Sequence, residues 1–365
     1  MMSIPNNTEN TISWWRTDLG EEEKSELVKA FSERRFTISS SVNQVESLAS
    51  SILKVPYVLM TNSGSSALLM ALLAIDINPD DEVIVPSLTW IATAQAPAIL
   101  RAKVILCDTL TDEPIIDTNQ IESLITPKTK AIIPVHFNGR YCNMEVIKFL
   151  ANKYKLSIIE DSCKGLFSSR NGKYFGTIGD IGCFSLGMIS PISIGFGGLV
   201  ATRNIAIYEK LKIIRDHGVI RNPENYSALG FNFKISDLLA SLAVPQFKNY
   251  QVKVENLIQI HNYYQQNLSC KELKILNIDK NLGSVPVYVE GYSENRDALI
   301  LYLDSLNIQT SKFHNPIHTA SYLNTATNKK FDNSTNFSNN AFILPSGPSQ
   351  YSRDIDRVLE ALNKF

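Results

Sequence analysis

The sequence predicts an α/β protein with a large, mostly parallel sheet domain and a smaller C-terminal α+β domain. Short apolar segments alternate with helical segments through about the first 250 residues, which is typical of parallel strands covered by helices on both faces. The alternation changes near residue 255, where longer helical segments begin. We therefore expect a large domain over residues 1–255 and a small domain over residues 256–365.

Periodicity predicts the order of elements in the large domain. The expected strands are apolar runs that end in turn residues, and they occupy residues 57–64, 82–87, 103–108, 130–137 and 156–162. The expected helices have apolar residues at helical spacing, and they occupy residues 65–75, 89–100, 118–125 and 144–154. Strands and helices therefore follow one another in the order that a parallel sheet requires.

The small domain is expected to begin with a helix over residues 251–268. A strand over residues 284–290 and helices over residues 294–306 and 353–365 should follow it. The polar run NTATNKKFDNSTNFSNN, residues 324–340, has the composition of a loop and is predicted to be one.

Composition excludes several classes of protein. The formal net charge of −1 gives no electrostatic reason to expect nucleic acid or an anionic membrane as a partner. The five cysteines form no CxxC pair and the histidines lack metal-ligand spacing, which favours a reducing cytoplasm and argues against disulfides and metal. Residues 183–202 carry no charge, but their glycines would weaken a membrane helix, so we expect a buried turn region there.

Three features lie beyond strand ends, where α/β sheets bind ligands. Gly64 and Ser65 begin a helix whose free N–H groups suit a phosphate, although an ordinary capped helix also explains them. Asp161 ends a strand and either caps a helix or pairs with a cationic ring nitrogen. Trp90 is either a core or surface aromatic residue or a ring that stacks on a planar cofactor.

Several long segments, in this order, resemble the DegT/StrS family of sugar aminotransferases, which are fold-type I enzymes that use pyridoxal phosphate (PLP). These segments are SGSSALLMALL, DEVIVPSLTWIATAQA, IIPVHFNGR, IIEDSCKG, GTIGDIGCFSLG, GFGGLVAT, IIRDHG, GFNFKISDLLASLAVPQF and FHNPIH. The resemblance covers most of the chain. It implies a cytoplasmic protein that acts on a keto-sugar, nucleotide-linked, in polysaccharide or secondary-metabolite biosynthesis.

The resemblance also assigns cofactor contacts. Gly64, Ser65 and Ser185 would hold the PLP phosphate, and Asn232 would reach it from the neighbouring subunit, which implies a homodimer. Trp90 would stack on the pyridine ring.

Two further sets of contacts follow from the same resemblance. Asp161 would keep the ring nitrogen protonated, so that the ring serves as an electron sink. His136, His314 and His318 lie in segments that resemble the lining of the substrate mouth.

The sequence departs from the family pattern at the lysine that forms the Schiff base with PLP. Counted from Phe184, that lysine should be residue 190, where this chain has Ser190, followed by Pro191. A second departure is Lys164, where the family commonly has Gln or His near the ring hydroxyl. A desolvated lysine there could act as a nucleophile or base, whereas the ordinary alternative is a side chain that points to solvent.

These departures leave three readings of the function. The first is an enzyme that binds PLP or pyridoxamine phosphate (PMP) without a covalent bond at residue 190. Its chemistry would be altered, resembling either an aminotransferase or a PMP-dependent dehydratase, with Lys164 as the assisting catalytic residue. The second is a catalytically silent paralogue that binds an active partner subunit, as a heterodimer, or a sugar nucleotide. The third is an ordinary aminotransferase whose lysine was replaced artificially. Pro191 and Phe196 argue against it, because they also depart from the family pattern, which often has a polar residue at position 196.

Overall fold

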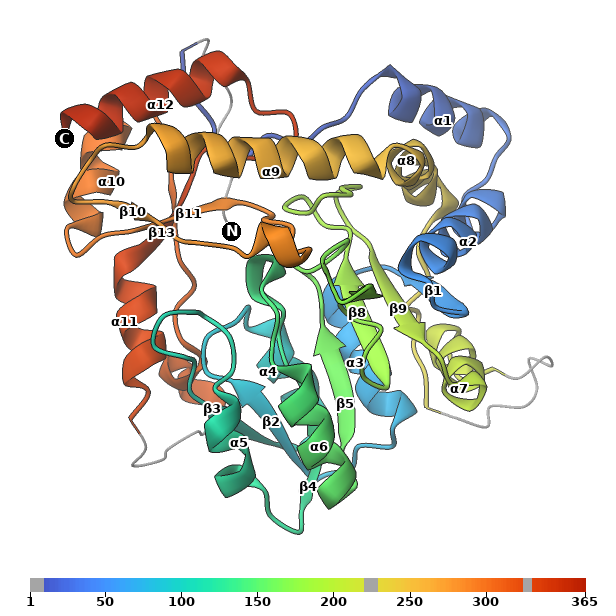
Figure 1. Ribbon diagram of the computed structural model, residues 1–365. Helices are drawn as coiled ribbons and strands as arrows, with labels where there is room; N and C mark the ends of the chain where they lie inside the picture. Colours follow the sequence, from blue (N-terminus) through green and yellow to red (C-terminus); the bar gives the residue numbers. More distant parts are fainter. Residues whose placement is uncertain (1–9, 220–228, 324–329) are drawn as a thin grey trace.

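The structure, a computed structural model, describes residues 10–219, 229–323 and 330–365 (Figure 1). A seven-stranded sheet forms the centre of the large domain. In spatial order its strands are β1 (Tyr57–Thr61), β9 (Gly198–Thr202), β8 (Ile181–Ser185), β5 (Ser157–Asp161), β4 (Thr129–Ile132), β2 (Glu82–Pro86) and β3 (Lys103–Cys107). Strand β9 is antiparallel to both neighbours, and the strands from β8 to β3 are parallel. The predicted fold class is therefore confirmed.

Helices cover the sheet on both faces, because the side chains of each strand point alternately to the two sides. In β2, Val83 and Val85 pack into one apolar cluster together with Leu68 of α3. Ile84, between them, packs into a second cluster with Ile147 of α6. The helices of this domain are α1 (Glu21–Ser32), α2 (Ser40–Leu53), α3 (Gly64–Ala74), α4 (Ala92–Ile99), α5 (Thr118–Leu124), α6 (Met144–Tyr154), α7 (Ile205–Arg215) and α8 (Asp237–Lys248).

Short elements complete the large domain. The 3-10 turn η1 (Phe137–Gly139) follows β4, and a hairpin of β6 (Ser169–Arg170) and β7 (Lys173–Tyr174) follows β5. The hairpin turn is Asn171–Gly172, with φ of 51° and 75°. An Asn-Gly pair with positive φ at both residues is typical of a two-residue hairpin turn.

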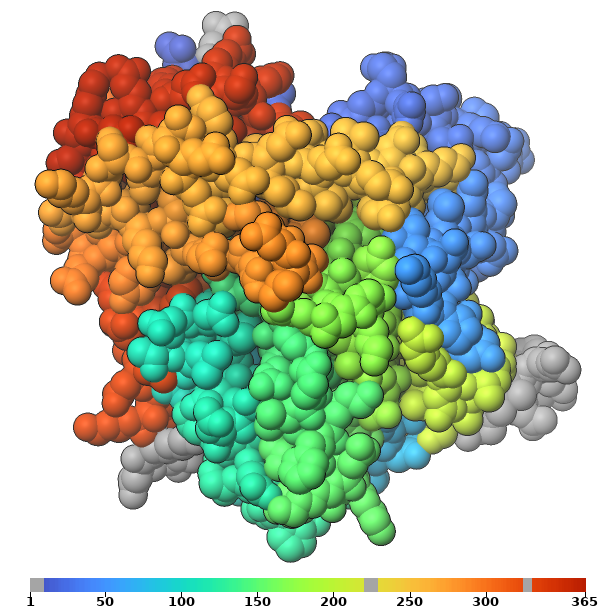
Figure 2. Space-filling model, in the orientation of Figure 1, coloured from blue at the N-terminus to red at the C-terminus, as the bar shows by residue number. Residues whose placement is uncertain are grey.

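The small domain is built on an antiparallel sheet in the order β10-β11-β13-β12. Its elements are α9 (Tyr250–Asn267), β10 (Lys274–Ile275), η2 (Lys280–Leu282), β11 (Val289–Tyr292), α10 (Arg296–Ser305), β12 (Ser311–Lys312), η3 (Ile317–Thr319), η4 (Ser321–Leu323), α11 (Asp332–Asn340), β13 (Ala341–Leu344) and α12 (Ser352–Lys364). Figure 2 shows α8 and α9 as a band across one face of the molecule. Residue 255, the expected domain boundary, falls inside α9.

Two predictions for the small domain need correction. The run expected to be a loop contains helix α11, while its residues 324–329 lie outside the described residues. Asp108, at the end of β3, accepts the N–H groups of Asn333 and Ser334 and so caps this helix from a distant part of the chain. The strand expected over residues 284–290 begins later, because Asn138 accepts the N–H group of Val287.

One further property concerns membranes. Within the described parts of the chain, no helix combines the length and apolar character that crossing a bilayer requires.

Candidate active site

The start of helix α3 forms a cradle beside β8 and β5. Ser63 caps the helix by accepting the N–H group of Ser66, at 3.0 Å. The first N–H groups of a helix have no acceptor within it, so those of Gly64 and Ser65 are available to a ligand. A Cβ atom on Gly64 would lie 2.8 Å from Cys163 Sγ and 3.1 Å from Ser185 Cβ, so only glycine allows this close approach. The structure therefore brings Gly64, Ser65 and Ser185 together.

Asp161 lies at the carboxyl end of β5, next to this cradle, and is buried. The Thr93 hydroxyl donates to one carboxylate oxygen at 2.7 Å, and the Cys163 N–H group donates to the other at 3.1 Å. These two hydrogen bonds fix the orientation of a carboxylate at the sheet end. Burial, with a further effect of Asp161, raises the pKa of the Cys163 thiol well above its usual value, so the thiol stays protonated.

Ser190 is buried in the loop that connects β8 to β9. Its hydroxyl donates to the Ser185 carbonyl oxygen at 2.7 Å. The Ser185 hydroxyl in turn accepts the N–H group of Gly187, at 3.1 Å. The Ser190 hydroxyl therefore stabilises this loop, and its proton is engaged in a hydrogen bond with the loop's own backbone.

Lys164 is half-buried and turns towards this loop rather than towards bulk solvent. Its ammonium group donates to the carbonyl oxygen of Ile189, the residue directly before Ser190. Burial lowers the pKa of Lys164 to about 8, against the opposing effects of Cys163 and Asp161. A lysine with this pKa exchanges its proton far more readily near neutral pH than an exposed lysine does.

Trp90 and His314 approach each other from the two domains. Trp90 follows β2 and is 57% exposed, and its ring centroid lies 5.1 Å from that of His314, edge to face. Burial and the Lys164 ammonium lower the pKa of His314 to about 4. His314 is therefore a neutral imidazole at pH 7.

Asn232 is exposed, and its backbone carbonyl lies beside Asn62, two residues before Gly64. That oxygen accepts the Asn62 side-chain amide at 3.3 Å. The Asn62 Oδ1 atom is buried and has no hydrogen-bond partner within the described part of the chain. An unpaired buried acceptor beside free helix N–H groups leaves hydrogen-bonding capacity at this place for a bound group.

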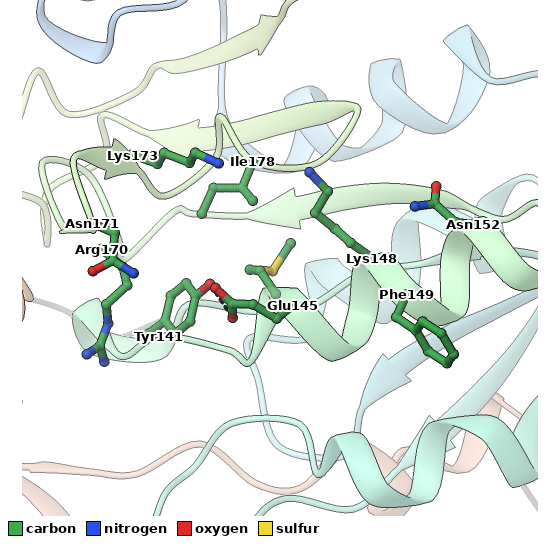
Figure 3. A pocket seen from close by; sticks show the side chains of 10 residues that line it. Tyr141, Glu145, Lys148, Phe149, Asn152, Arg170, Asn171, Lys173 and Ile178 are labelled. Carbon is green, nitrogen blue, oxygen red and sulfur yellow. Dashed lines mark hydrogen bonds between the residues drawn. The ribbon is translucent and has the colours of Figure 1, made fainter.

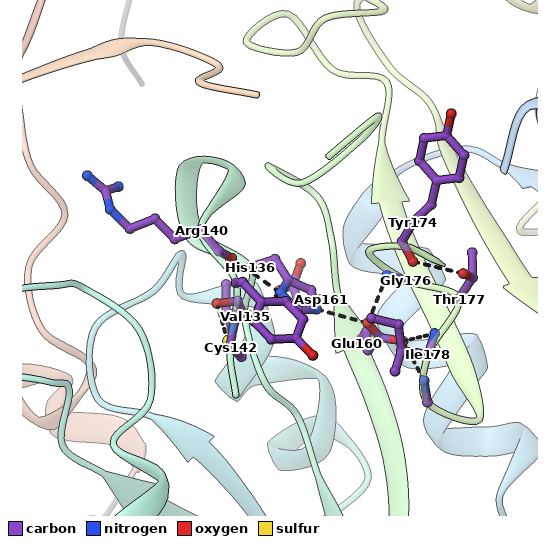
Figure 4. A network of polar contacts seen from close by, with 12 residues as sticks. Val135, His136, Arg140, Cys142, Glu160, Asp161, Tyr174, Gly176, Thr177 and Ile178 are labelled. Carbon is purple, nitrogen blue, oxygen red and sulfur yellow. Dashed lines mark hydrogen bonds and ion pairs between the residues drawn. The ribbon is translucent and has the colours of Figure 1, made fainter. Parts of the chain in front are cut away.

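His136 is fully buried behind the sheet end (Figure 4). Its ring lies 2.9 Å from the Glu160 carboxylate, and its other nitrogen faces the Arg140 carbonyl at 3.3 Å. Burial alone would lower the pKa of His136, but Cys142 and Glu160 outweigh it and raise the pKa to about 10. In this arrangement His136 forms a buried ion pair and offers no exposed surface to a substrate, so its predicted place in the substrate mouth receives no support.

His318 lies apart from His314, although the two are close in sequence. Its ring stacks on Phe331 with centroids 4.9 Å apart, and its Nε2 atom faces the Thr335 hydroxyl at 3.3 Å.

Local sequence patterns did not identify Thr93, Cys163 or the Ile189 carbonyl as parts of the site. No spacing signal links Thr93 with Asp161, because only the tertiary fold brings helix α4 to the carboxyl end of β5.

The fold is that of a known class of protein. The structure superposes on aminotransferase TlmJ from Streptoalloteichus hindustanus with a TM-score of 0.92 and 20% identity, over 97% of this chain and 98% of the other. Helicobacter pylori PseC, an aminotransferase of pseudoaminic acid biosynthesis, gives a TM-score of 0.88 and 21% identity, again over 97% and 98%. These likenesses define the fold of DegT-type aminotransferases.

The chain belongs to the DegT/DnrJ/EryC1/StrS aminotransferase family, whose model matches residues 17–363. Members of this family are PLP-dependent aminotransferases. The GDP-perosamine synthase of Caulobacter vibrioides is 31% identical over 320 residues, which cover 85% of this chain and 86% of that protein.

The residues present fit PLP or PMP. The glycine-dependent cradle with its free helix N–H groups and the oriented Asp161 carboxylate are what a phosphate and a cationic pyridine ring need at their two ends. Trp90 leaves more than half of its surface free for a planar group.

Proposed function

We propose that the protein binds PLP or PMP and acts on a keto-sugar, nucleotide-linked, in polysaccharide or secondary-metabolite biosynthesis. Family membership and the GDP-perosamine synthase relative support the substrate class. Gly64, Ser65 and Ser185 would hold the phosphate, and Asp161 would bind the ring nitrogen. When bound, the cofactor supplies an electron sink for a carbanion at the substrate.

The remaining cofactor contacts come from Trp90 and from a second copy of the chain. Trp90 would cover the ring and exclude water from it. Asn232 would reach the phosphate of the neighbouring subunit, which makes a homodimer the working form. The exposure of Asn232 supports this role, because an exposed side chain is accessible to a second copy of the chain.

We further propose that the cofactor is not covalently held at residue 190 and that the chemistry differs from that of an ordinary aminotransferase. The Ser190 hydroxyl is a poor base, and its proton is engaged by the Ser185 carbonyl. The residue therefore cannot take over the work of the family lysine. The reaction would then be aminotransferase-like with another base, or like that of a PMP-dependent dehydratase.

The single observation that carries this proposal is the hydrogen bond from Lys164 to the Ile189 carbonyl. It places an amine next to residue 190, although the lysine that supplies it comes from a different segment. With a pKa of about 8, the Lys164 Nζ atom can both hold and release a proton near neutral pH. His314, neutral beside it, would accept a hydrogen bond from the amine or from a sugar hydroxyl, while His318 would contact the sugar nucleotide farther out.

Borohydride reduction of the PLP-treated protein, followed by peptide mapping, tests the role of Lys164. A label at Lys164 supports a covalent role, and a label elsewhere or no label excludes it. Lys164→Ala is then assayed for half-reactions with PMP and keto-sugar nucleotides, with Lys248→Ala, on an exposed part of α8, as the matched control. Unchanged activity of Lys164→Ala would also exclude a role as base.

A second candidate function is that of a catalytically silent subunit that binds an active paralogue or a sugar nucleotide. It is favoured by Phe196 and Phe231, whose apolar side chains are 74% and 69% exposed, as subunit-contact residues are in an isolated chain. If millimolar PLP leaves both the absorption spectrum and the melting temperature unchanged, the silent function is preferred.

A further inference from the structure

A pocket of about 410 Å3 lies outside the candidate active site, between helix α6 and the β6–β7 hairpin (Figure 3). Met144, Lys148 and Asn152 line it from one face of α6, since residues four apart lie above one another on a helix. The other lining residues are Tyr141, Glu145, Phe149, Arg170, Asn171, Lys173 and Ile178. None of them belongs to the cofactor cradle or to the groups around Lys164.

Three cations surround this pocket, and they are poorly neutralised. Within the described residues, Lys148 and Lys173 form no ion pair with a carboxylate. Arg170 has Asp279 at 3.6 Å, and its Nε atom is buried without a hydrogen-bond partner in the same part of the chain. The one lining carboxylate, Glu145, accepts a hydrogen bond from the Tyr141 hydroxyl at 2.8 Å. The pocket therefore carries an excess of positive charge in a chain whose net charge is −1.

The hairpin places two of these cations directly opposite each other. Arg170 and Lys173 are register partners across β6 and β7. In Figure 3 the two side chains leave the hairpin in different directions, with Arg170 near Tyr141 and Lys173 near Ile178.

Hydrogen bonds and a ring contact with buried residues fix the two walls of the pocket. Both Ile178 and Gly179 donate their N–H groups to Glu160 at 2.6 Å, and Gly176 donates to the same carboxylate at 2.9 Å (Figure 4). On the other wall, the Tyr141 ring stacks on buried His136, with centroids 6.2 Å apart. A pocket fixed in this way needs little ordering when a ligand binds.

We propose that this pocket binds the phosphate groups of a small phosphorylated molecule. Lys148, Arg170 and Lys173 bind the phosphate oxygens, and the fork of Arg170 adds directed hydrogen bonds. The Asn152 and Asn171 amides contact the rest of the molecule. The cavity has the size of a small-molecule site and exceeds what a single phosphate fills.

Calorimetric titration of the full-length protein, free of cofactor, with inorganic pyrophosphate tests the proposal. We expect saturable binding that weakens at least tenfold in Lys148→Gln/Lys173→Gln and also in about 0.5 M NaCl. The matched control is Lys248→Gln/Lys271→Gln, which removes two exposed lysines that do not line the pocket and should change the affinity less than twofold. Melting temperatures of all variants verify that they are folded.

A second variant separates this pocket from the cofactor cradle, which also suits phosphate. Ser65→Ala/Ser185→Ala removes the cradle hydroxyls and should leave pyrophosphate binding within twofold of the unmodified protein. The proposal is overturned if pyrophosphate does not bind at millimolar concentration, if the pocket variant binds normally, or if only the cradle variant loses binding. None of these outcomes depends on the proposed catalytic function.

Discussion

The lowered pKa of Lys164 makes a specific prediction for stability against pH. The folded pKa is about 8 and the ordinary value is 10.5, so between these values the unfolded chain binds more protons than the folded one. Stability therefore increases with pH in this window, and the full cost of the buried ammonium is present below pH 8. Lys164→Met removes the titrating group and with it this pH dependence.

The magnitude follows from the shift. Each pKa unit corresponds to about 1.4 kcal/mol, so a shift from 10.5 to about 8 corresponds to about 3 kcal/mol in total. Because the side chain is half-buried, solvent screens part of this cost. Between about pH 7 and about pH 9.5 we expect the protein to gain about 1–2 kcal/mol of unfolding free energy relative to Lys164→Met.

Urea unfolding midpoints at fixed protein concentration measure this difference. Lys164→Arg provides a control, because its guanidinium stays charged throughout and should show no recovery at high pH. Lys248→Met, in an exposed position, should follow the unmodified protein at every pH. If the difference in unfolding free energy between the protein and Lys164→Met is the same at both pH values, the amine is solvated. The argument for its role as a base then fails.

Three other predictions concern the cradle, the buried ion pair and the hairpin. Gly64→Ala places a Cβ atom 2.8 Å from Cys163 Sγ and should weaken PLP binding at least tenfold in absorbance titrations; equal affinity would contradict the cradle. His136→Gln leaves Glu160 buried without its cation and should cost about 3 kcal/mol at neutral pH in urea unfolding. The ion pair of His136 contributes fully to the unfolding free energy below the ordinary pKa of 6.5, and this contribution is lost as pH rises to about 10. The difference in unfolding free energy between the protein and His136→Gln should therefore narrow over that range. A difference that widens would refute the pairing. In Gly172→Ala the added Cβ atom meets no atom within 4 Å, so only the φ of 75° at this residue opposes the change. We expect the unfolding free energy to decrease by about 1 kcal/mol, measured as a lower melting temperature. An unchanged melting temperature would argue against the turn.

Local patterns were sufficient to predict much of the large domain. Strand β2 and helix α3 lie within two residues of their expected positions, because each has the period and the boundary residues of its type. Long-range contacts were not predictable in this way. The Asp108 caps of α11 join residues more than 200 positions apart, and a polar run without them has the composition of a loop.

The same distinction applies to the candidate site. Gly64 and Asp161 are recognisable because a helix start and a strand end have local signatures. The bond from Lys164 to the Ile189 carbonyl, and the burial of His136 against Glu160, depend on how loops from different strands meet. A side chain's role in such places is decided by its surroundings, which a single sequence does not specify.

The loop over residues 186–197 begins and ends beside the start of helix α3, where the cradle lies. Ser185 pairs with Gly198 across β8 and β9, and Gly198 approaches so closely to Ser63 that a Cβ atom there would lie 2.5 Å from the Ser63 carbonyl. The two ends of the loop are thus set by backbone pairing and close approach, while in its interior Ile192 and Ile194 pack in the core and Ser190 donates to the Ser185 carbonyl. Under the proposed function, the groups that hold the phosphate and the residue that sets the reaction would therefore be changed by different mutations. On that proposal, an exchange of the residue at position 190 would alter the reaction while the phosphate-binding residues remain in place.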